Sequence, residues 1–283
     1  MHLRRALALV ASFVLICLLP ALPAAAAERG FNDWNCRPSA EHPQPVVLVH
    51  GLGAGRLLNW AYMGPRIAAT GRCVYSLDYG AGAFGIKGIA PMADSAVELG
   101  GFVDRVLAKT GADRVDIVGH SEGTTVPAYY IKYAGGAAKV RRMIGFAPNY
   151  RGTTLNGLNE LVHGLADAAP YLAEAFYDGV CAACLEYLPP SAFLDELNLG
   201  GSAATPGVEY VNIATRYDRT VVPYTSGFMG APNARDVLLQ ERCPLDFSNH
   251  IGMAISPNVL SLVLNALDPS RPVVCVPHWP LGL

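Results

Sequence analysis

Charge is scarce in this chain, and no part of it is strongly basic. Only 16% of its 283 residues are charged, and the formal net charge is −2. Proteins that attract nucleic acid or anionic membranes carry clusters of Lys and Arg. Because no such cluster is present, we expect neither nucleic acid nor an anionic membrane surface as a partner.

The apolar run near the N-terminus is too short to span a bilayer, which takes about 20 residues. Two arginines precede this run at residues 6–19, and four consecutive alanines end at Ala27. A charged start, a short apolar core and small residues at the end predict a secretory signal peptide at residues 1–27. An uncleaved N-terminal anchor is the alternative. We expect a secreted mature domain at residues 28–283, without a transmembrane segment.

Cysteines are few, and their number after export is even. Of the seven, Cys17 lies in the predicted signal peptide, and six remain. An even count in an exported chain predicts disulfides. Zinc binding is the alternative, because Cys181 and Cys184 form a C-x-x-C pair, but no second paired cluster has zinc spacing. We therefore expect no metal and no cofactor.

Short apolar segments alternate with helical patterns along the chain, without an internal repeat or a low-complexity linker. Candidate strands lie at residues 46–49, 74–79, 115–118, 143–146 and 208–213, with a possible sixth at 237–239. Helical patterns occupy residues 93–109, 122–137 and 258–266. This alternation predicts an α/β fold in one domain, with a mainly parallel sheet covered by helices on both faces.

One segment departs from the alternation, because residues 152–205 are longer than a single crossover needs. An apolar stripe at helical spacing runs through it, and Pro170 predicts a break there. The stripe consists of Leu158, Leu161, Val162, Leu165, Ala169, Leu172 and Phe176. We expect a helical, lid-like insertion at the C-terminal edge of the sheet, where such folds place active sites. Its stripe would cover the site and line an acyl pocket or, alternatively, pack on the sheet as ordinary core.

Residues 119–123 read Gly-His-Ser-Glu-Gly and match the motif G-x-S-x-G. The match lies between a candidate strand and a candidate helix, which is the context that gives this motif its meaning. The turn strains the backbone of the serine, and its neighbours two positions away must be small. We interpret Ser121 as a nucleophile exposed above the sheet.

A serine nucleophile needs two backbone N–H groups directed at the developing oxyanion. One comes from the residue after the nucleophile, here Glu122, and the other from the loop after the first strand. Leu52 lies in that loop beside glycines that allow a close backbone approach. We interpret His50 as orienting this loop, because a catalytic base in this fold follows the serine.

The order serine, acid, histidine narrows the choice of the base. Three histidines follow the motif: His163 lies in the insertion, His278 in a proline-rich tail, and His250 in a loop before the final helix. We predict His250 as the base. For the acid, Asp218 directly follows a candidate strand, whereas Asp246 lies four residues before His250 and would shape that turn. Its position just after a strand favours Asp218 as the acid, but residue spacing alone does not decide between Asp218 and Asp246.

With these residues the chain resembles the bacterial class 2 lipases, secreted α/β-hydrolases of actinobacteria. The resemblance covers most of the mature chain. It includes Asn32–Cys36, Val47–Gly51, Leu77–Gly80, Phe102–Leu107, Val118–Ser121, Tyr129–Lys132, Gly152–Leu155, Thr215–Asp218, Val222–Tyr224 and Leu264–Pro269. It implies that Ser121, Asp218 and His250 are the nucleophile, acid and base, and it supports Asp218 over Asp246.

The chain departs from the family pattern at two places. Where many relatives carry Gln and Gly after the nucleophile, this chain has Glu122 and Thr124. The backbone N–H of Glu122 is unaffected, but a negative charge beside the nucleophile would alter rate or substrate choice. The oxyanion loop at residues 52–55 also lacks the more polar residues expected in some relatives.

The six remaining cysteines allow fifteen pairings. We propose that Cys36 pairs with Cys73, Cys181 with Cys184, and Cys243 with Cys275. The last bridge would join the loop ahead of the predicted base to the C-terminal tail and help to hold that base in place.

Three functions remain open at this stage. The first is a secreted lipase that acts on acylglycerols and contacts the lipid–water interface. The second is an esterase, a cutinase-like polyester hydrolase or an acyltransferase, which would use the same catalytic parts. The third is a non-catalytic secreted binding protein that keeps only the fold. The complete set of serine, aspartate and histidine argues against this third function, because a binding protein does not need it. We therefore expect an enzyme whose partner is a lipid or ester substrate.

Overall fold

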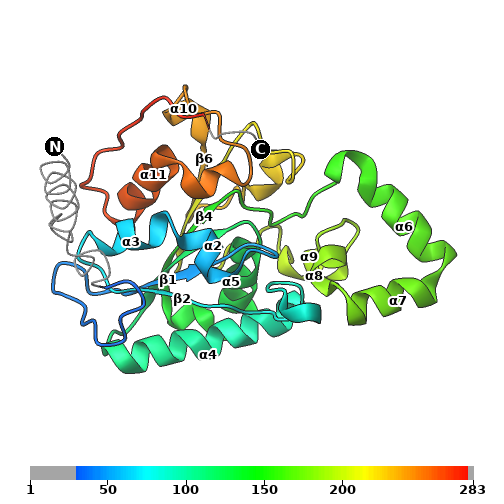
Figure 1. Cartoon of the computed structure of the whole chain (residues 1–283), viewed down its shortest axis with the longest axis horizontal. Coiled ribbons are helices and arrows are strands. Elements are labelled where there is room, and N and C mark those ends of the chain that lie inside the picture. The colour runs from blue at the N-terminus through cyan, green and yellow to red at the C-terminus, as the bar shows by residue number, and fades with distance from the viewer. Residues whose placement is uncertain (1–29, 280–283) are drawn as a thin grey trace, which may run out of the picture.

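The structure is a computed structural model that describes residues 30–279. The predicted signal peptide lies outside the described residues. Within them, one sheet of six parallel strands has the order β2-β1-β3-β4-β5-β6 (Figure 1). The strands are β1 (Val46–Val49), β2 (Val74–Ser76), β3 (Val115–His120), β4 (Val140–Phe146), β5 (Glu209–Ala214) and β6 (Ala234–Leu238). The predicted α/β fold with a mainly parallel sheet is confirmed.

Helices cover both faces of the sheet, and each face has its own apolar core. One core contains the inward sides of α4 (Met92–Thr110) and α5 (Glu122–Tyr133). The other contains residues of α2 (Gly55–Trp60), α3 (Met63–Ala68) and α11 (Pro257–Leu267). Successive side chains of a strand point to opposite faces, and the four residues of β1 accordingly alternate between the two cores and are all fully buried.

The segment at residues 152–205, between β4 and β5, is mostly helical. It contains α6 (Leu158–Ala168), α7 (Pro170–Gly179), α8 (Ala182–Glu186) and α9 (Ala192–Leu197). The break falls at the predicted place, since α6 ends at Ala168 and Pro170 is the first residue of α7. Proline suits that position because its missing N–H has no partner in a first turn.

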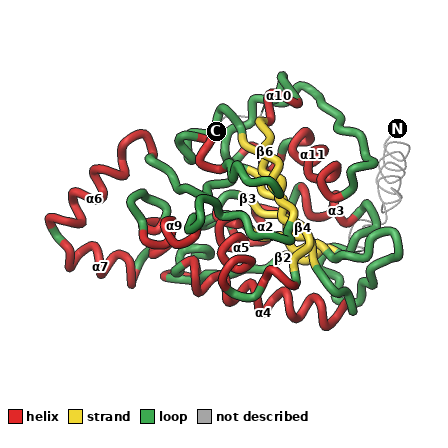
Figure 2. Tube along the Cα trace, turned by 180° about the vertical axis from the view of Figure 1, so that it is seen from behind, coloured by secondary structure: helices red, strands yellow, loops and turns green. Residues whose placement is uncertain are grey.

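The apolar stripe of the insertion is largely exposed, whereas the sequence predicts that it covers the site and lines an acyl pocket or, alternatively, packs on the sheet as core. Helix α6 contains no buried residue, and the side chains of Leu165 and Phe176 are 62% and 40% exposed. Together α6 and α7 form a hairpin that extends away from the body of the molecule (Figures 1 and 2). The stripe therefore contributes little to the core and leaves an apolar surface uncovered.

Three disulfides join Cys36 to Cys73, Cys181 to Cys184, and Cys243 to Cys275, in the pairing proposed from the sequence. The first fastens the N-terminal segment to the residue before β2. The last fastens the segment after α10 (Leu239–Arg242) to the C-terminal tail. Among residues 30–279, no helix is both long and apolar enough to cross a membrane.

Candidate active site

Ser121 occupies a sharp turn between the end of β3 and the start of α5. Its backbone has φ 55° and ψ −123°, a conformation that a residue other than glycine seldom adopts. A Cβ atom on Gly119 would overlap the carbonyl oxygen of Gly123, and one on Gly123 would overlap the carbonyl oxygen of Val49. The two motif glycines are therefore required by close backbone packing, and the turn presents the serine at the C-terminal edge of the sheet.

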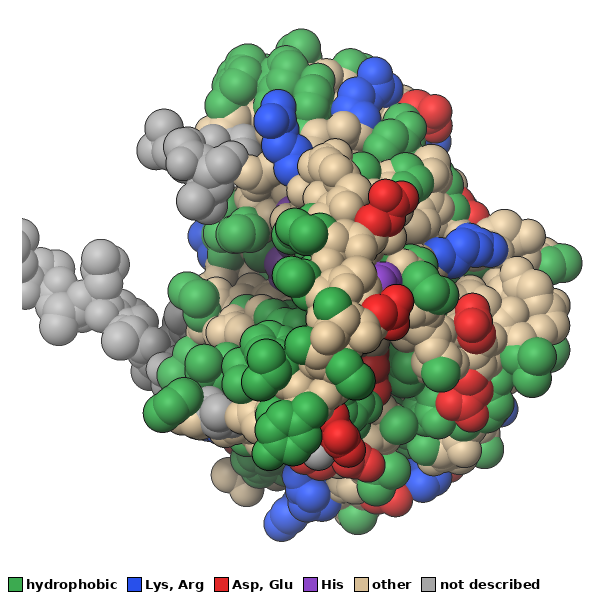
Figure 3. Space-filling view, turned by 90° about the vertical axis from the view of Figure 1, so that its right-hand side faces the viewer, with side chains coloured by type: hydrophobic (Ala, Val, Ile, Leu, Met, Phe, Trp, Pro, Cys, Tyr) green, Lys and Arg blue, Asp and Glu red, His purple; other side chains and the backbone are tan. Residues whose placement is uncertain are grey.

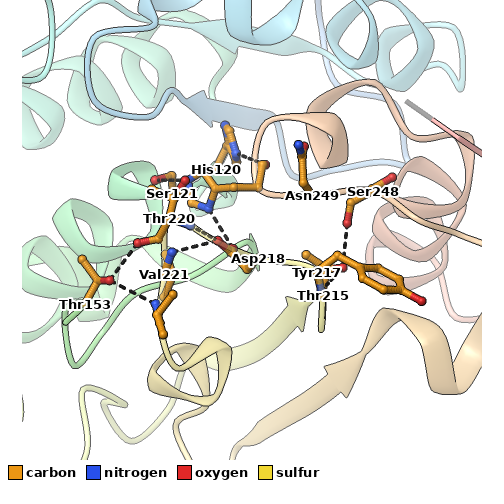
Figure 4. A network of polar contacts seen from close by, with 12 residues as sticks. His120, Ser121, Thr153, Thr215, Tyr217, Asp218, Thr220, Val221, Ser248 and Asn249 are labelled. Carbon is orange, nitrogen blue, oxygen red and sulfur yellow. Dashed lines mark hydrogen bonds and ion pairs between the residues drawn. The ribbon is translucent and has the colours of Figure 1, made fainter. Parts of the chain in front are cut away.

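Two hydrogen bonds connect the side chains of Ser121, His250 and Asp218. Ser121 and Asp218 are labelled in the polar network of Figure 4. Oγ of Ser121 lies 2.8 Å from Nε2 of His250, and Nδ1 of His250 lies 2.8 Å from Oδ2 of Asp218. A carboxylate only accepts hydrogen bonds, so Nδ1 carries the proton and Nε2 is left to accept one from Ser121. All three residues are at least nine-tenths buried. The structure thus brings together the three residues that the sequence predicted as nucleophile, base and acid.

The carboxylate of Asp218 is oriented by its own loop. Its Oδ1 accepts hydrogen bonds from the backbone N–H groups of Thr220, at 2.9 Å, and Val221, at 2.7 Å. The hydroxyl of Thr153 donates to the carbonyl oxygen of Thr220 at 2.7 Å and accepts from the N–H of Val222 at 3.0 Å. The start of the insertion therefore supports the loop that carries the acid.

Asp246, the alternative acid, has a different set of partners. Its Oδ1 accepts from the backbone N–H of Ser248 at 2.8 Å, as expected for an aspartate that shapes a turn. Its Oδ2 accepts from the hydroxyl of Ser256 at 2.6 Å and from Nδ2 of Asn258 at 2.8 Å. Asp246 is fully buried and ties the loop ahead of His250 to the start of α11.

The other two histidines that follow the serine also have partners of their own. On α6, Nε2 of His163 lies 3.0 Å from the carbonyl oxygen of Leu188, within the insertion. His278 forms backbone hydrogen bonds with Leu245 and Phe247. Of the three candidates for the base, His250 is the one that contacts Ser121.

His120, the second residue of the motif, is a buried neighbour of the base. One of its ring nitrogens lies 3.1 Å from the backbone carbonyl oxygen of His250, and the other lies 2.9 Å from Oδ1 of Asn59. Burial, followed by the nearby His250, lowers the pKa of His120 to about 3. The ring is therefore neutral at ordinary pH and does not oppose a positive charge on His250.

The loop after β1 passes directly beside the serine. A Cβ on Gly51 would lie 3.1 Å from Cβ of Ser121, and the N–H of Gly51 donates to Oδ1 of Asn59 at 3.1 Å. Within residues 30–279, no hydrogen bond is found for the N–H of Leu52, and the N–H of Glu122 lies in the first turn of α5, where helices leave such groups unpaired. Two unpaired N–H groups therefore flank the serine.

His50 interacts with the backbone of this same loop. Its Nδ1 lies 2.8 Å from the carbonyl oxygen of Gly51, and its ring stacks on that of Tyr79 with centroids 4.4 Å apart. Burial lowers the pKa of His50, so that its ring is neutral. These contacts agree with the interpretation that His50 orients the oxyanion loop.

Several supporting residues were not identified from the sequence. Asn59 links Gly51 to His120, and Thr153 braces the loop that carries Asp218. Asn59 is 61 residues from His120 and Thr153 is 69 residues from Val222, so no local motif marks these contacts. For Thr153, the only sequence signal is its place at the start of the long insertion.

Exposed apolar side chains lie on segments that follow the C-terminal ends of the parallel strands. Figure 3 shows hydrophobic side chains gathered on the side of the molecule from which the hairpin of α6 and α7 extends. The exposed large hydrophobic residues of this region are Leu57, Leu58, Phe84, Ile86, Leu158, Leu161, Leu165, Tyr171, Leu172, Phe176, Ile251 and Ile255. We call this set the apolar rim.

A parallel six-stranded sheet with a strained serine at the β3–α5 turn defines an α/β hydrolase. Residues 43–261 match the family model of the class 2 lipases, "Lipase (class 2)". Because this match covers most of the chain, the protein belongs to the class 2 lipase family, within the lipases and esterases.

Solved structures share the fold at low sequence identity. The chain is similar to lipase B of Aspergillus fumigatus, with a TM-score of 0.62 and 17% identity over 81% of this chain and 55% of that one. It thus spans about half the length of that lipase. It is also similar to the mature lipase BlEst2 of Bacillus licheniformis, with a TM-score of 0.60 and 14% identity over 82% of this chain and 94% of that one. A thermophilic esterase of Thermogutta terrifontis gives a TM-score of 0.54 and 16% identity over 83% and 92% of the two chains.

Proposed function

We propose that this protein is a secreted lipase, a serine hydrolase that cleaves fatty acyl esters of the acylglycerol type through Ser121, His250 and Asp218. The observation that carries the proposal is the continuous hydrogen-bond path from Oγ of Ser121 through His250 to Asp218. Such a path is what an otherwise weak hydroxyl nucleophile needs for activation.

The proposed reaction proceeds through an acyl-enzyme. Oγ of Ser121 forms a bond to the ester carbonyl carbon, and Nε2 of His250 takes the hydroxyl proton. The bond from that carbon to the alcohol oxygen then breaks, and His250 returns the proton to the leaving alcohol. Water attacks the acyl-enzyme in the same way and releases the fatty acid. Asp218 holds the proton on Nδ1 and stabilises the imidazolium.

The N–H groups of Leu52 and Glu122 form the proposed oxyanion hole. Both flank Ser121 and are free to bind an incoming oxygen, as described above. Each such donor stabilises the transition state by about 3 kcal/mol. In a complex with a bound phosphonate, both nitrogens should lie about 3 Å from its oxygen, and an oxygen directed elsewhere would refute this assignment.

The apolar rim supports a lipid as the substrate. An exposed apolar surface of this extent on a soluble protein marks an interaction site. We infer that the hairpin of α6 and α7 contacts the lipid–water interface and the acyl chain, whereas the sequence predicts that this segment covers the site and lines an acyl pocket. The predicted signal peptide at residues 1–27 and the three disulfides support secretion.

Substrate chain length tests the lipase proposal. Each CH₂ group that the enzyme buries stabilises the complex by about 0.8 kcal/mol, which is about fourfold in kcat/KM. We expect kcat/KM for p-nitrophenyl esters to rise from acetate towards long acyl chains, and we expect hydrolysis of an emulsified triglyceride. The variant Ser121→Ala should lose activity on all of these substrates by several orders of magnitude.

The hairpin is tested by replacing two members of the apolar rim, Leu165 and Phe176, with Ala. The double variant should lower the ratio of triglyceride to p-nitrophenyl acetate hydrolysis. The matched control is Leu199→Ala, which truncates an exposed leucine outside the rim. If the ratio stays at the wild-type value and acetate is the best ester, the function is that of a short-chain esterase. Transfer of the acyl group to an added alcohol in preference to water would instead indicate an acyltransferase.

A further inference from the structure

The side chain of Glu122, next to the serine, is buried with no countercharge. Its exposed fraction is 0%, and neither carboxyl oxygen accepts a hydrogen bond from a donor among residues 30–279. A Cβ on Gly88 would lie 3.2 Å from Oε1 of Glu122 and 3.3 Å from Cα of Leu52. The carboxyl group therefore packs between the loop after β2 and the oxyanion loop.

The surroundings of this carboxyl group favour its neutral form. Burial, above all, raises the pKa of Glu122 well above its usual value; the contact with Tyr79 acts in the opposite direction, and the acidic Glu186 raises this pKa further. The other titratable groups that face it are the phenols of Tyr79 and Tyr187, whose own pKa values are raised by burial. Among the described groups that act on this carboxyl, none is a cation.

Tyr79 joins this carboxyl group to the oxyanion loop. Its hydroxyl donates to the backbone carbonyl oxygen of His50 at 2.7 Å, which uses the one proton that a phenol has. The phenol oxygen can therefore only accept a further hydrogen bond. A carboxylic acid can donate that bond, whereas a carboxylate cannot.

We propose that Glu122 is a positioning residue of the active site that works in its protonated form, and that its ionisation switches off the oxyanion hole. The neutral acid donates a hydrogen bond to Tyr79, which in turn donates to His50, so that the start of α5 holds the loop that carries Leu52. Loss of the proton removes this link and leaves a negative charge beside an anion-binding site. This inference rests on the proposed serine hydrolase function.

The expected kinetic signature is a loss of kcat at alkaline pH. A negative charge near Leu52 opposes the oxyanion of the transition state but acts much less on a neutral ester in the ground state. Above the pKa of Glu122, kcat should therefore fall by about tenfold per pH unit, as for a single ionisation, with little change in KM.

Glu122→Gln is the decisive variant. An amide donates to the phenol oxygen as the acid does, but it does not ionise. With soluble p-nitrophenyl acetate, the ratio of kcat at high pH to kcat at pH 8 should stay near one in Glu122→Gln and fall in the wild type. Glu241→Gln makes the same chemical change on an exposed carboxylate, and its pH profile should follow the wild type. Identical alkaline profiles for the wild type and Glu122→Gln would overturn the proposal.

Glu122→Leu removes the donor while keeping an apolar side chain. Its kcat should be about fivefold lower at every pH, which corresponds to the loss of one neutral hydrogen bond. Recovery in Glu122→Gln of the activity lost in Glu122→Leu is expected. Equal losses in both variants would overturn the positioning role.

Thermal stability tests the protonation of Glu122 without any need for activity. Its folded-state pKa is raised, so the unfolded chain loses this proton at a lower pH than the folded protein does. Stability of the wild type is therefore lost as pH rises from the ordinary pKa of a glutamate towards the raised pKa of the folded protein, and Glu122→Gln does not share this loss. The Tm of Glu122→Gln minus that of the wild type should grow with pH over this range. A constant difference would overturn the proposal, whatever substrate the enzyme cleaves.

Discussion

Replacing Asp218 by Asn removes one charge and leaves the geometry of its loop nearly intact. Oδ1 of the new side chain can still accept from the N–H groups of Thr220 and Val221, as Asp218 does at 2.9 and 2.7 Å. The NH₂ group would then face Nδ1 of His250, where Oδ2 now lies at 2.8 Å. Because an NH₂ group only donates there, Nδ1 must accept and the imidazole proton moves to Nε2. Nε2 then has no lone pair to take the proton of Ser121.

The expected loss is about 10⁴-fold in kcat, the size of effect known for a wrong imidazole tautomer in serine proteases. This corresponds to about 5 kcal/mol in the activation free energy. Stability should change far less, because the two backbone hydrogen bonds to Oδ1 are kept. The assay is kcat on a soluble p-nitrophenyl ester, with the melting temperature measured on the same samples.

Asp246→Asn is the matched control. In Asp246, Oδ2 accepts hydrogen bonds from the hydroxyl of Ser256 and from Nδ2 of Asn258. In the variant an NH₂ group would take the place of Oδ2, so two NH₂ donors, its own and that of Asn258, would face each other in a buried site. We expect a loss of about 1–3 kcal/mol in the free energy of unfolding and less than a tenfold change in kcat in the folded protein. A larger loss of kcat in Asp246→Asn than in Asp218→Asn would refute the choice of the acid.

Three further predictions concern the support of the site. Gly119→Ala should lower the free energy of unfolding by a few kcal/mol and abolish turnover, because its methyl group would overlap the carbonyl oxygen of Gly123; denaturant unfolding and active-site titration measure both effects. Replacing Cys243 and Cys275 together by Ala opens a link with a sequence separation of 32, which should cost about 4 kcal/mol in urea unfolding. The pKa of His120 is lowered to about 3, so below the ordinary histidine pKa the unfolded chain takes up a proton that the folded protein does not. The free energy of unfolding should therefore fall by about 3 kcal/mol from pH 7 to pH 4. His120→Gln should flatten that dependence, and an unchanged slope in that variant would contradict a neutral His120.

The sheet could be predicted from the sequence because five of its strands are buried on both faces and read as short apolar runs. β6 was placed less well, at residues 237–239 instead of Ala234–Leu238. It lies at the edge of the sheet and contains Arg235 and Asp236, so the apolar signal covers only part of it. β4 shows the same effect of charged residues, because Arg141 and Arg142 interrupt its apolar run and it was predicted to begin at residue 143 instead of Val140. Local apolar patterns therefore locate the apolar part of a strand better than its charged part.

Other features depend on packing that local sequence does not encode. The stripe of α6 has the spacing of a core-facing helix, yet the hairpin extends away from the body, and periodicity alone does not say what a stripe contacts. The sequence located Glu122 but could not tell whether its carboxyl group faces water or the interior. That orientation depends on Gly88 and Tyr79, which other segments bring to the site.

The most direct test of the central claim is covalent labelling by a fluorophosphonate, followed by peptide mapping. A serine activated by His250 attacks phosphorus and displaces fluoride, which leaves a stable adduct on Oγ. We predict one adduct per molecule, on the peptide that contains Ser121, and none in Ser121→Ala or in denatured protein. An adduct on another residue, or undiminished labelling of Ser121→Ala, would contradict the proposed mechanism.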